Sequence, residues 1–226
     1  MITQTELHFD LKPIIEQVNS LDMSSRSLQL NETTGNLLTG KYTIKPEFLN
    51  TPLGDVLESL GDIGEARLLK LESEEVYTAH TDPDDRFHLI ISTTPYAYIV
   101  DCENDVLYHL PANGYVYYMD TSIMHSAVNL GGTERIHLNV RVRLPEISYP
   151  CHELTFKIKD EAEWKQKLYN SMMGYINKQV KIGIVTGIEK VDERSIKLNA
   201  HVKVIDDIVQ AVKSIGYDVG VRVVQH

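Results

Sequence analysis

A histidine and an aspartate stand two residues apart in the segment YTAHTD, residues 77–82. In a strand, residues i and i+2 share one face, so His80 and Asp82 would point the same way, about 7 Å apart at the backbone. One metal ion could bind both side chains. A histidine from another strand would complete a set of two histidines and one carboxylate, which leaves coordination positions open and suits non-haem Fe(II).

The sequence offers several histidines as the third ligand, and His125 fits best. It follows the strand-like run YVYYMD, and the aspartate and threonine before it indicate a turn onto a further strand. His88 stands too close to the HxD pair to be an obvious ligand, and His109 lies in a predicted loop before Pro111. A lone histidine is more often a surface or core residue. The remaining candidates are His137, His152, His201 and His226.

The run RIHLNVRVRL, residues 135–144, alternates strictly between polar and apolar residues. Two interpretations are open: a half-exposed strand with a solvated polar face, or a strand whose polar face lines an interior that holds an anion. Arginine suits the second, because its planar guanidinium binds a carboxylate through two parallel hydrogen bonds. Arg86 and His88 share a face in the run RFHLII in the same way, which favours the interior reading.

The elements that would position these residues are mainly strands. From Glu65 to Leu144 the sequence has period two, with turn residues between the runs, and this favours an antiparallel sandwich or barrel. Before it, a short strand at 7–11 precedes a helix from Lys12-Pro13, and a second helix is predicted over 51–60 with Thr51 as its N-cap. After a break at 145–153, helical and strand-like runs predict a small α+β appendage. We therefore predict two parts, residues 1–150 and 151–226.

Composition limits the functional classes. The chain has 226 residues and a net charge of −10, and it shows no basic cluster, so nucleic acid is not an expected partner. Its two cysteines, Cys102 and Cys151, do not suggest a disulfide framework. The N-terminus does not read as a signal peptide, and no apolar run is long enough for a membrane span. The expected location is the cytoplasm.

Taken together, residues Gly64–Leu144 resemble the aspartyl/asparaginyl β-hydroxylase family of Fe(II)- and 2-oxoglutarate-dependent dioxygenases, to which bacterial proline hydroxylases are related. The resemblance rests on a set of features in order: the HxD pair, the RxH strand, a turn from an aspartate to a histidine, an asparagine, and an arginine ten residues after that histidine. Here these are His80 and Asp82, Arg86 and His88, Asp120 and His125, Asn129, and Arg135.

The resemblance implies a double-stranded β-helix (a cupin-like jelly roll) with flanking helices. It implies iron on His80, Asp82 and His125, and 2-oxoglutarate with its C5 carboxylate on Arg135 and a hydrogen bond from His88. Arg86 would help to bind cosubstrate or substrate. The implied reaction consumes O2 and hydroxylates an unactivated C–H bond, and it releases succinate and CO2.

The substrate and two alternatives stay open at this point. The substrate is expected to be a small molecule or a peptide: a peptidyl Asp or Asn, or a free amino acid such as proline. Arg141 and Arg143 either hold a substrate carboxylate or, as we expect, lie past the end of the polar face in water. A metalloenzyme of cupin type without oxoglutarate, or a non-catalytic ligand-binding jelly roll, would share much of the pattern.

The predicted helix at 160–178 carries an apolar stripe, which we expect to pack on the β domain or on a second subunit in a homodimer. The stripe consists of Trp164, Leu168, Met172 and Tyr175.

Overall fold

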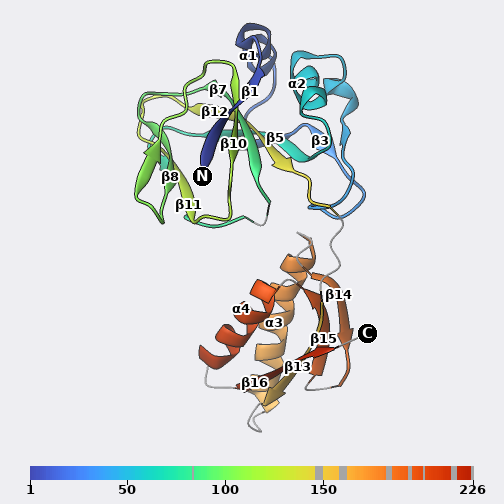
Figure 1. Cartoon of the computed structure of the whole chain (residues 1–226). Coiled ribbons are helices and arrows are strands. Elements are labelled where there is room, and N and C mark those ends of the chain that lie inside the picture. The colour runs from blue at the N-terminus through green and yellow to red at the C-terminus, as the bar shows by residue number, and fades with distance from the viewer. Residues whose placement is uncertain are drawn as a thin grey trace. The chain divides into compact units, whose positions relative to one another are not determined.

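The computed structural model divides the chain into two compact units, Met1–Leu144 and Pro145–His226 (Figure 1). The sequence places this boundary at residue 150. The structure describes residues 1–82, 84–145, 150–157, 162–181, 185–192, 195–200, 202–214 and 218–224. Over these residues the chain is mainly β with several antiparallel sheets, as predicted.

Two antiparallel sheets make up most of the N-terminal unit. One has six strands in the order β1-β10-β7-β12-β5-β2, and the other has four in the order β6-β11-β8-β9. The strands are β1 (Ile2–His8), β2 (Ser27–Gln29), β5 (Ile63–Leu71), β6 (Glu75–Val76), β7 (Arg86–Ser92), β8 (Ala97–Asp101), β9 (Val106–Tyr108), β10 (Tyr115–Met119), β11 (His125–Asn129) and β12 (Arg135–Val142). β3 (Asn31–Glu32) and β4 (Thr43–Ile44) form a separate two-stranded sheet, and the Asn31 side chain bonds to the backbone of β5. The described strands form no closed barrel.

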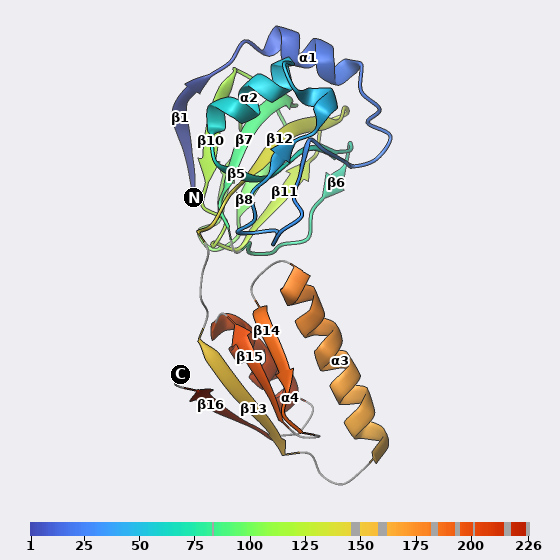
Figure 2. The ribbon, with the colours of Figure 1, turned by 90° about the vertical axis from the view of Figure 1, so that its right-hand side faces the viewer.

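Two helices cover one face of the six-stranded sheet. They are α1 (Leu11–Asn19) and α2 (Pro52–Leu60), which lie side by side over the strands in Figure 2. The apolar residues of β12 belong to a buried core with helix residues such as Ile14 and Val56. The alternation of β12 thus turns its apolar face to the helices and its polar face to the other side of the sheet.

The helix starts follow the sequence signals closely. Thr51 is the N-cap of α2, its hydroxyl accepts a hydrogen bond from the Gly54 amide, and Pro52 is the first helical residue, as predicted. Helix α1 begins at Leu11, one residue earlier than predicted, because the Asp10 side chain caps the Lys12 amide. A 3-10 turn, η1 (Pro46–Phe48), precedes α2.

The strand prediction was wrong at one decisive place. The segment before Asp82 was expected to continue a strand, but β6 ends at Val76 and His80 forms only an isolated bridge to His125. The shared face expected from strand periodicity therefore does not bring His80 and Asp82 together. Strand β11, which begins at His125, is the further strand that the sequence predicts after the turn.

The C-terminal unit has the element order β-α-β-β-α-β. Its sheet runs β14-β15-β13-β16, antiparallel throughout, which is the split β-α-β arrangement. The elements are β13 (Cys151–Lys157), α3 (Ala162–Lys181), β14 (Val185–Lys190), β15 (Ser195–Ala200), α4 (Val202–Ser214) and β16 (Asp218–Val224). The expected α+β character is present, while strand β13 was missed because Pro145 and Pro150 suggested a break.

The apolar stripe of α3 does not pack as expected. Met172 is buried in the core of the C-terminal unit, and Tyr175 packs against the same core. The side chains of Trp164 and Leu168 lie outside the described residues. None of the described helices combines the length and apolar character that crossing a membrane would require.

Candidate metal centre

His80, Asp82 and His125 form a compact group in the N-terminal unit. Their potential ligand atoms all lie within 4.8 Å of one another. The Nε2 atoms of His80 and His125 lie 3.8 and 3.9 Å from Oδ2 of Asp82. One cation could contact all three, as the sequence predicts, although the chain reaches this arrangement by another route.

Backbone pairing between two distant segments builds the group. The amide of His80 donates to the carbonyl of His125 at 2.9 Å, and the amide of His125 donates back to His80 at 2.9 Å. The Asp82 amide donates to the Thr121 carbonyl at 2.9 Å. His80 and Asp82 are thus fixed against the turn and strand around His125 by these bonds, in place of the strand predicted between residues 77 and 82.

Local hydrogen bonds orient both imidazoles. Nδ1 of His80 lies 2.8 Å from the Thr78 carbonyl, and Nδ1 of His125 lies 2.9 Å from the Ile123 carbonyl. A carbonyl can only accept, so Nδ1 carries the proton in both rings and each Nε2 keeps a lone pair toward Asp82. This is the usual way in which a metal-binding histidine is held in the right tautomer.

The electrostatics suit a neutral imidazole at His125. Burial lowers the pKa of His125 below its ordinary value, and this outweighs the hydrogen bond to Ile123. A lowered pKa keeps the ring neutral at neutral pH, so that one nitrogen carries no proton, and only the neutral ring can bind a metal. His80 differs in exposure: 44% of its side chain is accessible, so it lies at the open side of the group.

A cavity of about 100 Å³ adjoins the three residues, and Arg135 lies in its wall. Arg135 is 7% exposed, and its Nε atom is buried without a hydrogen-bond partner among the described residues. Burial lowers its pKa to about 10, which leaves the guanidinium charged at neutral pH. The structure therefore brings a buried cation with unused donor capacity to the same cavity as the group of His80, Asp82 and His125.

The polar face of β12 is buried. His137 and Asn139 are nearly inaccessible, and so is His88 of β7, which also lines the cavity. Nε2 of His88 lies 3.2 Å from the Asn139 amide nitrogen, and its Nδ1 lies 3.4 Å from Nδ1 of His137. The interpretation of this face as a solvated surface is wrong for these residues.

Arg86 is held by two carboxylates. Its Nη2 lies 3.0 Å from Oδ2 of Asp82, and its Nη1 lies 2.5 Å from Oδ1 of Asp84.

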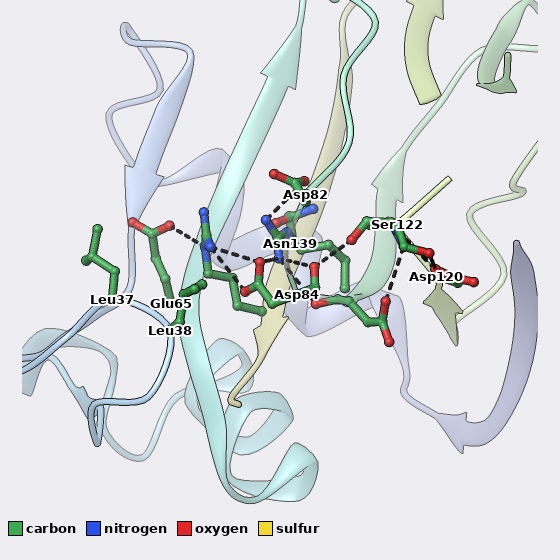
Figure 3. Close-up of polar contacts among 12 residues, drawn as sticks. Leu37, Leu38, Glu65, Asp82, Asp84, Asp120, Ser122 and Asn139 are labelled. Carbon is green, nitrogen blue, oxygen red and sulfur yellow. Dashed lines mark hydrogen bonds and ion pairs between the residues drawn. The ribbon is translucent and has the colours of Figure 1, made fainter. Parts of the chain in front are cut away.

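Arg141 shares Asp84 with Arg86. Its Nη1 lies 3.0 Å from Oδ1 of Asp84, and its Nε lies 3.2 Å from Oε2 of Glu65. In Figure 3, dashed contacts run from Glu65 through Asp84 toward Asp82. The expectation that Arg141 lies in water is wrong, and Arg143 pairs with Asp62.

The other candidate histidines do not join the group. His109 bonds the Ala97 carbonyl through Nδ1, and His152 belongs to the C-terminal unit. His201 and His226 lie outside the described residues.

Two further residues line the cavity that were not predicted from the sequence, Arg67 and Tyr77. Arg67 could have been found from the alternation of β5, since it stands directly opposite Asn139 of β12.

Comparison of the chain with protein-family models and with curated protein sequences finds no match.

Proposed function

We propose that the protein is an Fe(II)- and 2-oxoglutarate-dependent dioxygenase that hydroxylates an unactivated C–H bond of an amino-acid-type substrate. One observation carries this proposal. The group of His80, Asp82 and His125 shares a cavity with Arg135, a buried arginine whose Nε has no partner among the described residues.

The residues fit the two groups that this chemistry needs. Two neutral imidazoles and one carboxylate are the donor set of non-haem Fe(II) oxygenases, so His80, Asp82 and His125 would hold the iron. Arg135 would hold the distal carboxylate of oxoglutarate, because a guanidinium binds a carboxylate through paired charge-assisted bonds. When bound, iron and oxoglutarate would supply dioxygen activation and C–H hydroxylation, with succinate and CO2 as the other products.

The chain's own residues contribute binding, orientation and shielding. Arg135 would orient oxoglutarate from the first residue of β12. His88 has a pKa lowered to about 3, chiefly by burial, so it is neutral and can take part in hydrogen bonds to the cosubstrate without adding charge. Ile99 and Met119 lie in the apolar part of the cavity wall and exclude water beside the group.

The jelly roll implied by the resemblance is part of the proposal, and the strand order supports it. The eight strands from β5 to β12 divide equally between the two sheets. Four of them lie side by side in the order β10-β7-β12-β5, and the other four lie in the order β6-β11-β8-β9. A double-sheet jelly roll places eight strands in two four-stranded sheets in this way. β1 and β2 then extend the first sheet at its two edges.

Unlike the proposed oxygenase, a metalloenzyme that works without oxoglutarate would not need a buried cation beside the metal. Such an enzyme has no use for Arg135 in the cavity, whereas an unpaired buried guanidinium is costly unless a ligand anion binds it. The location of Arg135 therefore favours the oxygenase. A non-catalytic binding module would not need the paired Nε2 atoms that face Asp82.

Anaerobic Fe(II) and oxoglutarate binding provides the test. We expect a weak visible metal-to-ligand charge-transfer band in the wild-type protein, none in His125→Ala, and a band that needs much more oxoglutarate in Arg135→Ala. Arg143→Ala removes an arginine outside the cavity wall and serves as the matched control. Iron binding without any band at saturating oxoglutarate would reject the oxygenase and favour the other metalloenzyme.

A further inference from the structure

The cavity wall carries more positive than negative charge. Its lining includes four cationic side chains but a single carboxylate, that of Asp82. The cations are Arg67, Lys70, Arg86 and Arg135. A cation in a partly buried wall is stable only where a carboxylate or solvent compensates it, so the partners of each one show which are available to a ligand.

Two of the four cations are already compensated. Lys70 lies 2.8 Å from Glu72 and 3.7 Å from Glu134. Arg86 lies between Asp82 and Asp84, as described above, and is 3% exposed. Carboxylates of the chain therefore already balance the charge of both residues.

Arg67 has a much weaker partner. Its Nη1 lies 3.8 Å from Oε2 of Glu65, beyond hydrogen-bond distance, and the same oxygen lies 3.2 Å from Nε of Arg141. The Nε of Arg67 is buried and has no hydrogen-bond partner among the described residues. One third of the side chain remains accessible, so an incoming molecule can reach it.

The position of Arg67 directs it to the same interior as the oxoglutarate residues. In the register of the six-stranded sheet, Arg67 of β5 is opposite Asn139 of β12, and Asn139 is opposite His88 of β7. Directly paired residues share a face of a sheet. Arg67 therefore stands in one row with two buried polar residues, and Arg67, Asn139 and His88 all line the cavity.

We infer that the substrate carries a carboxylate and that Arg67 receives it. The inference rests on the proposed function, in which Arg135 is occupied by oxoglutarate and Arg67 is the remaining cation with no carboxylate within hydrogen-bond distance among the described residues. Two sources of the carboxylate fit: the main-chain carboxylate of a free amino acid, or the side chain of an aspartate within a peptide. Arg67 acts in recognition and takes no part in bond breaking.

The selectivity expected from this contact is for an acid over its amide. A guanidinium gains paired charge-assisted hydrogen bonds from a carboxylate, but an amide offers one neutral acceptor and a donor that the guanidinium cannot use. A charged hydrogen bond contributes enough to change affinity by about 10- to 100-fold. The amide should therefore bind at least about tenfold more weakly.

Calorimetry on the full chain loaded with Zn(II) and oxoglutarate tests this without turnover. The probes are matched acid and amide pairs: free L-amino acids, including L-proline, against their C-terminal amides, and a capped aspartyl peptide against its asparaginyl counterpart. We expect the acid of at least one pair to bind and its amide to bind at least about tenfold more weakly. The pair that shows the difference identifies the source of the carboxylate.

Three variants separate the possible results. Arg67→Gln should lose the preference for the acid while oxoglutarate binds as in the wild type, Arg67→Lys should retain part of it, and Arg143→Gln should retain all of it. Equal binding of acids and amides, no binding of any acid, or weakened oxoglutarate binding in Arg67→Gln would each overturn the inference. Failure of the wild-type protein to bind oxoglutarate would instead reject the proposed function.

Discussion

Nη2 of Arg86 lies 3.0 Å from Oδ2 of Asp82, the same oxygen that faces the Nε2 atoms of His80 and His125. Arg86 itself is clamped by the buried carboxylate of Asp84, which is shared with Arg141. These alternating charges hold the Asp82 carboxylate in place next to both imidazoles. This geometry predicts a positioning role for Arg86 on Asp82, which differs from the cosubstrate contact implied by the family resemblance.

Substitution of Arg86 should weaken metal binding. Outer residues that orient a ligand typically contribute about 10- to 100-fold to metal affinity, so we expect a loss in that range for Arg86→Gln and a smaller one for Arg86→Lys. Titration with Zn(II) or Mn(II) measures the affinity, and Arg143→Gln is the control. Unchanged metal affinity in Arg86→Gln, combined with a loss of oxoglutarate affinity, would restore the cosubstrate role.

Metal binding should stabilise the N-terminal unit. A ligand that binds only the folded state adds RT ln(1 + [L]/Kd) to the free energy of unfolding, about 2.7 kcal/mol at 100 times Kd. Thermal unfolding of the wild-type protein should therefore move to higher temperature with added metal and return with a chelator. His125→Ala and Asp82→Ala should show no such shift. A metal-dependent shift that persists in both variants would place the metal elsewhere.

Much of the framework follows from local sequence signals. Thr51 and Pro52 predict the start of α2 because capping and a fixed proline φ act within one turn. The alternation over Arg135–Val142 predicts β12 because a strand between a helix-covered face and a polar interior must have period two. The three metal-binding candidates were also named correctly as a group that could hold an ion.

The remaining features depend on contacts that no local pattern encodes. His80 and Asp82 are held by bonds to His125 and Thr121, more than 30 residues away, so strand periodicity gave the wrong reason for their proximity. The burial of Arg141 depends on Glu65 and Asp84, two acids that are distant from it in sequence. Period two separates the two faces of a strand but cannot tell which face meets solvent.

The free energy of unfolding should fall in mild acid because of two buried histidines. Burial, with Arg135 as the next cause, lowers the pKa of His88 to about 3 and that of His137 well below its ordinary value. Below about pH 6.5 the unfolded chain takes up protons that the folded state excludes, so stability falls by about 1.4 kcal/mol per pH unit for each histidine. This loss continues until the pH reaches the folded pKa.

Denaturant unfolding between about pH 7 and about pH 5 measures this slope. In His137→Phe the free energy of unfolding should depend less steeply on pH, by about 1.4 kcal/mol per pH unit. The reason is that the substituted side chain no longer binds a proton in the unfolded state. His8→Gln, which removes an exposed histidine, is the control. If the slope of His137→Phe equals that of the wild type, His137 is protonated within the fold.

Asn129 should be a structural residue whose loss affects Arg135 indirectly. It is fully buried, its Nδ2 lies 3.0 Å from the Glu72 carbonyl and 2.8 Å from the Thr133 carbonyl, and its Oδ1 accepts from the Gly131 amide at 3.1 Å. These bonds tie the end of β5 to the turn that leads into β12. Arg135, the first residue of β12, therefore depends on this side chain for its place.

Asn129→Ala leaves several buried polar groups without partners, each costing about 1–3 kcal/mol, so we expect a loss of about 2–4 kcal/mol in the free energy of unfolding. Asn104→Ala, which removes one side-chain hydrogen bond from an exposed asparagine to Asp101, should cost less than about 1 kcal/mol. Oxoglutarate affinity should weaken in Asn129→Ala, while metal affinity, which depends on the segment from His80 to His125, should change much less. Equal losses of both affinities would mean that the turn supports the whole cavity, and no loss of either would show that β12 is held in place by its sheet neighbours alone.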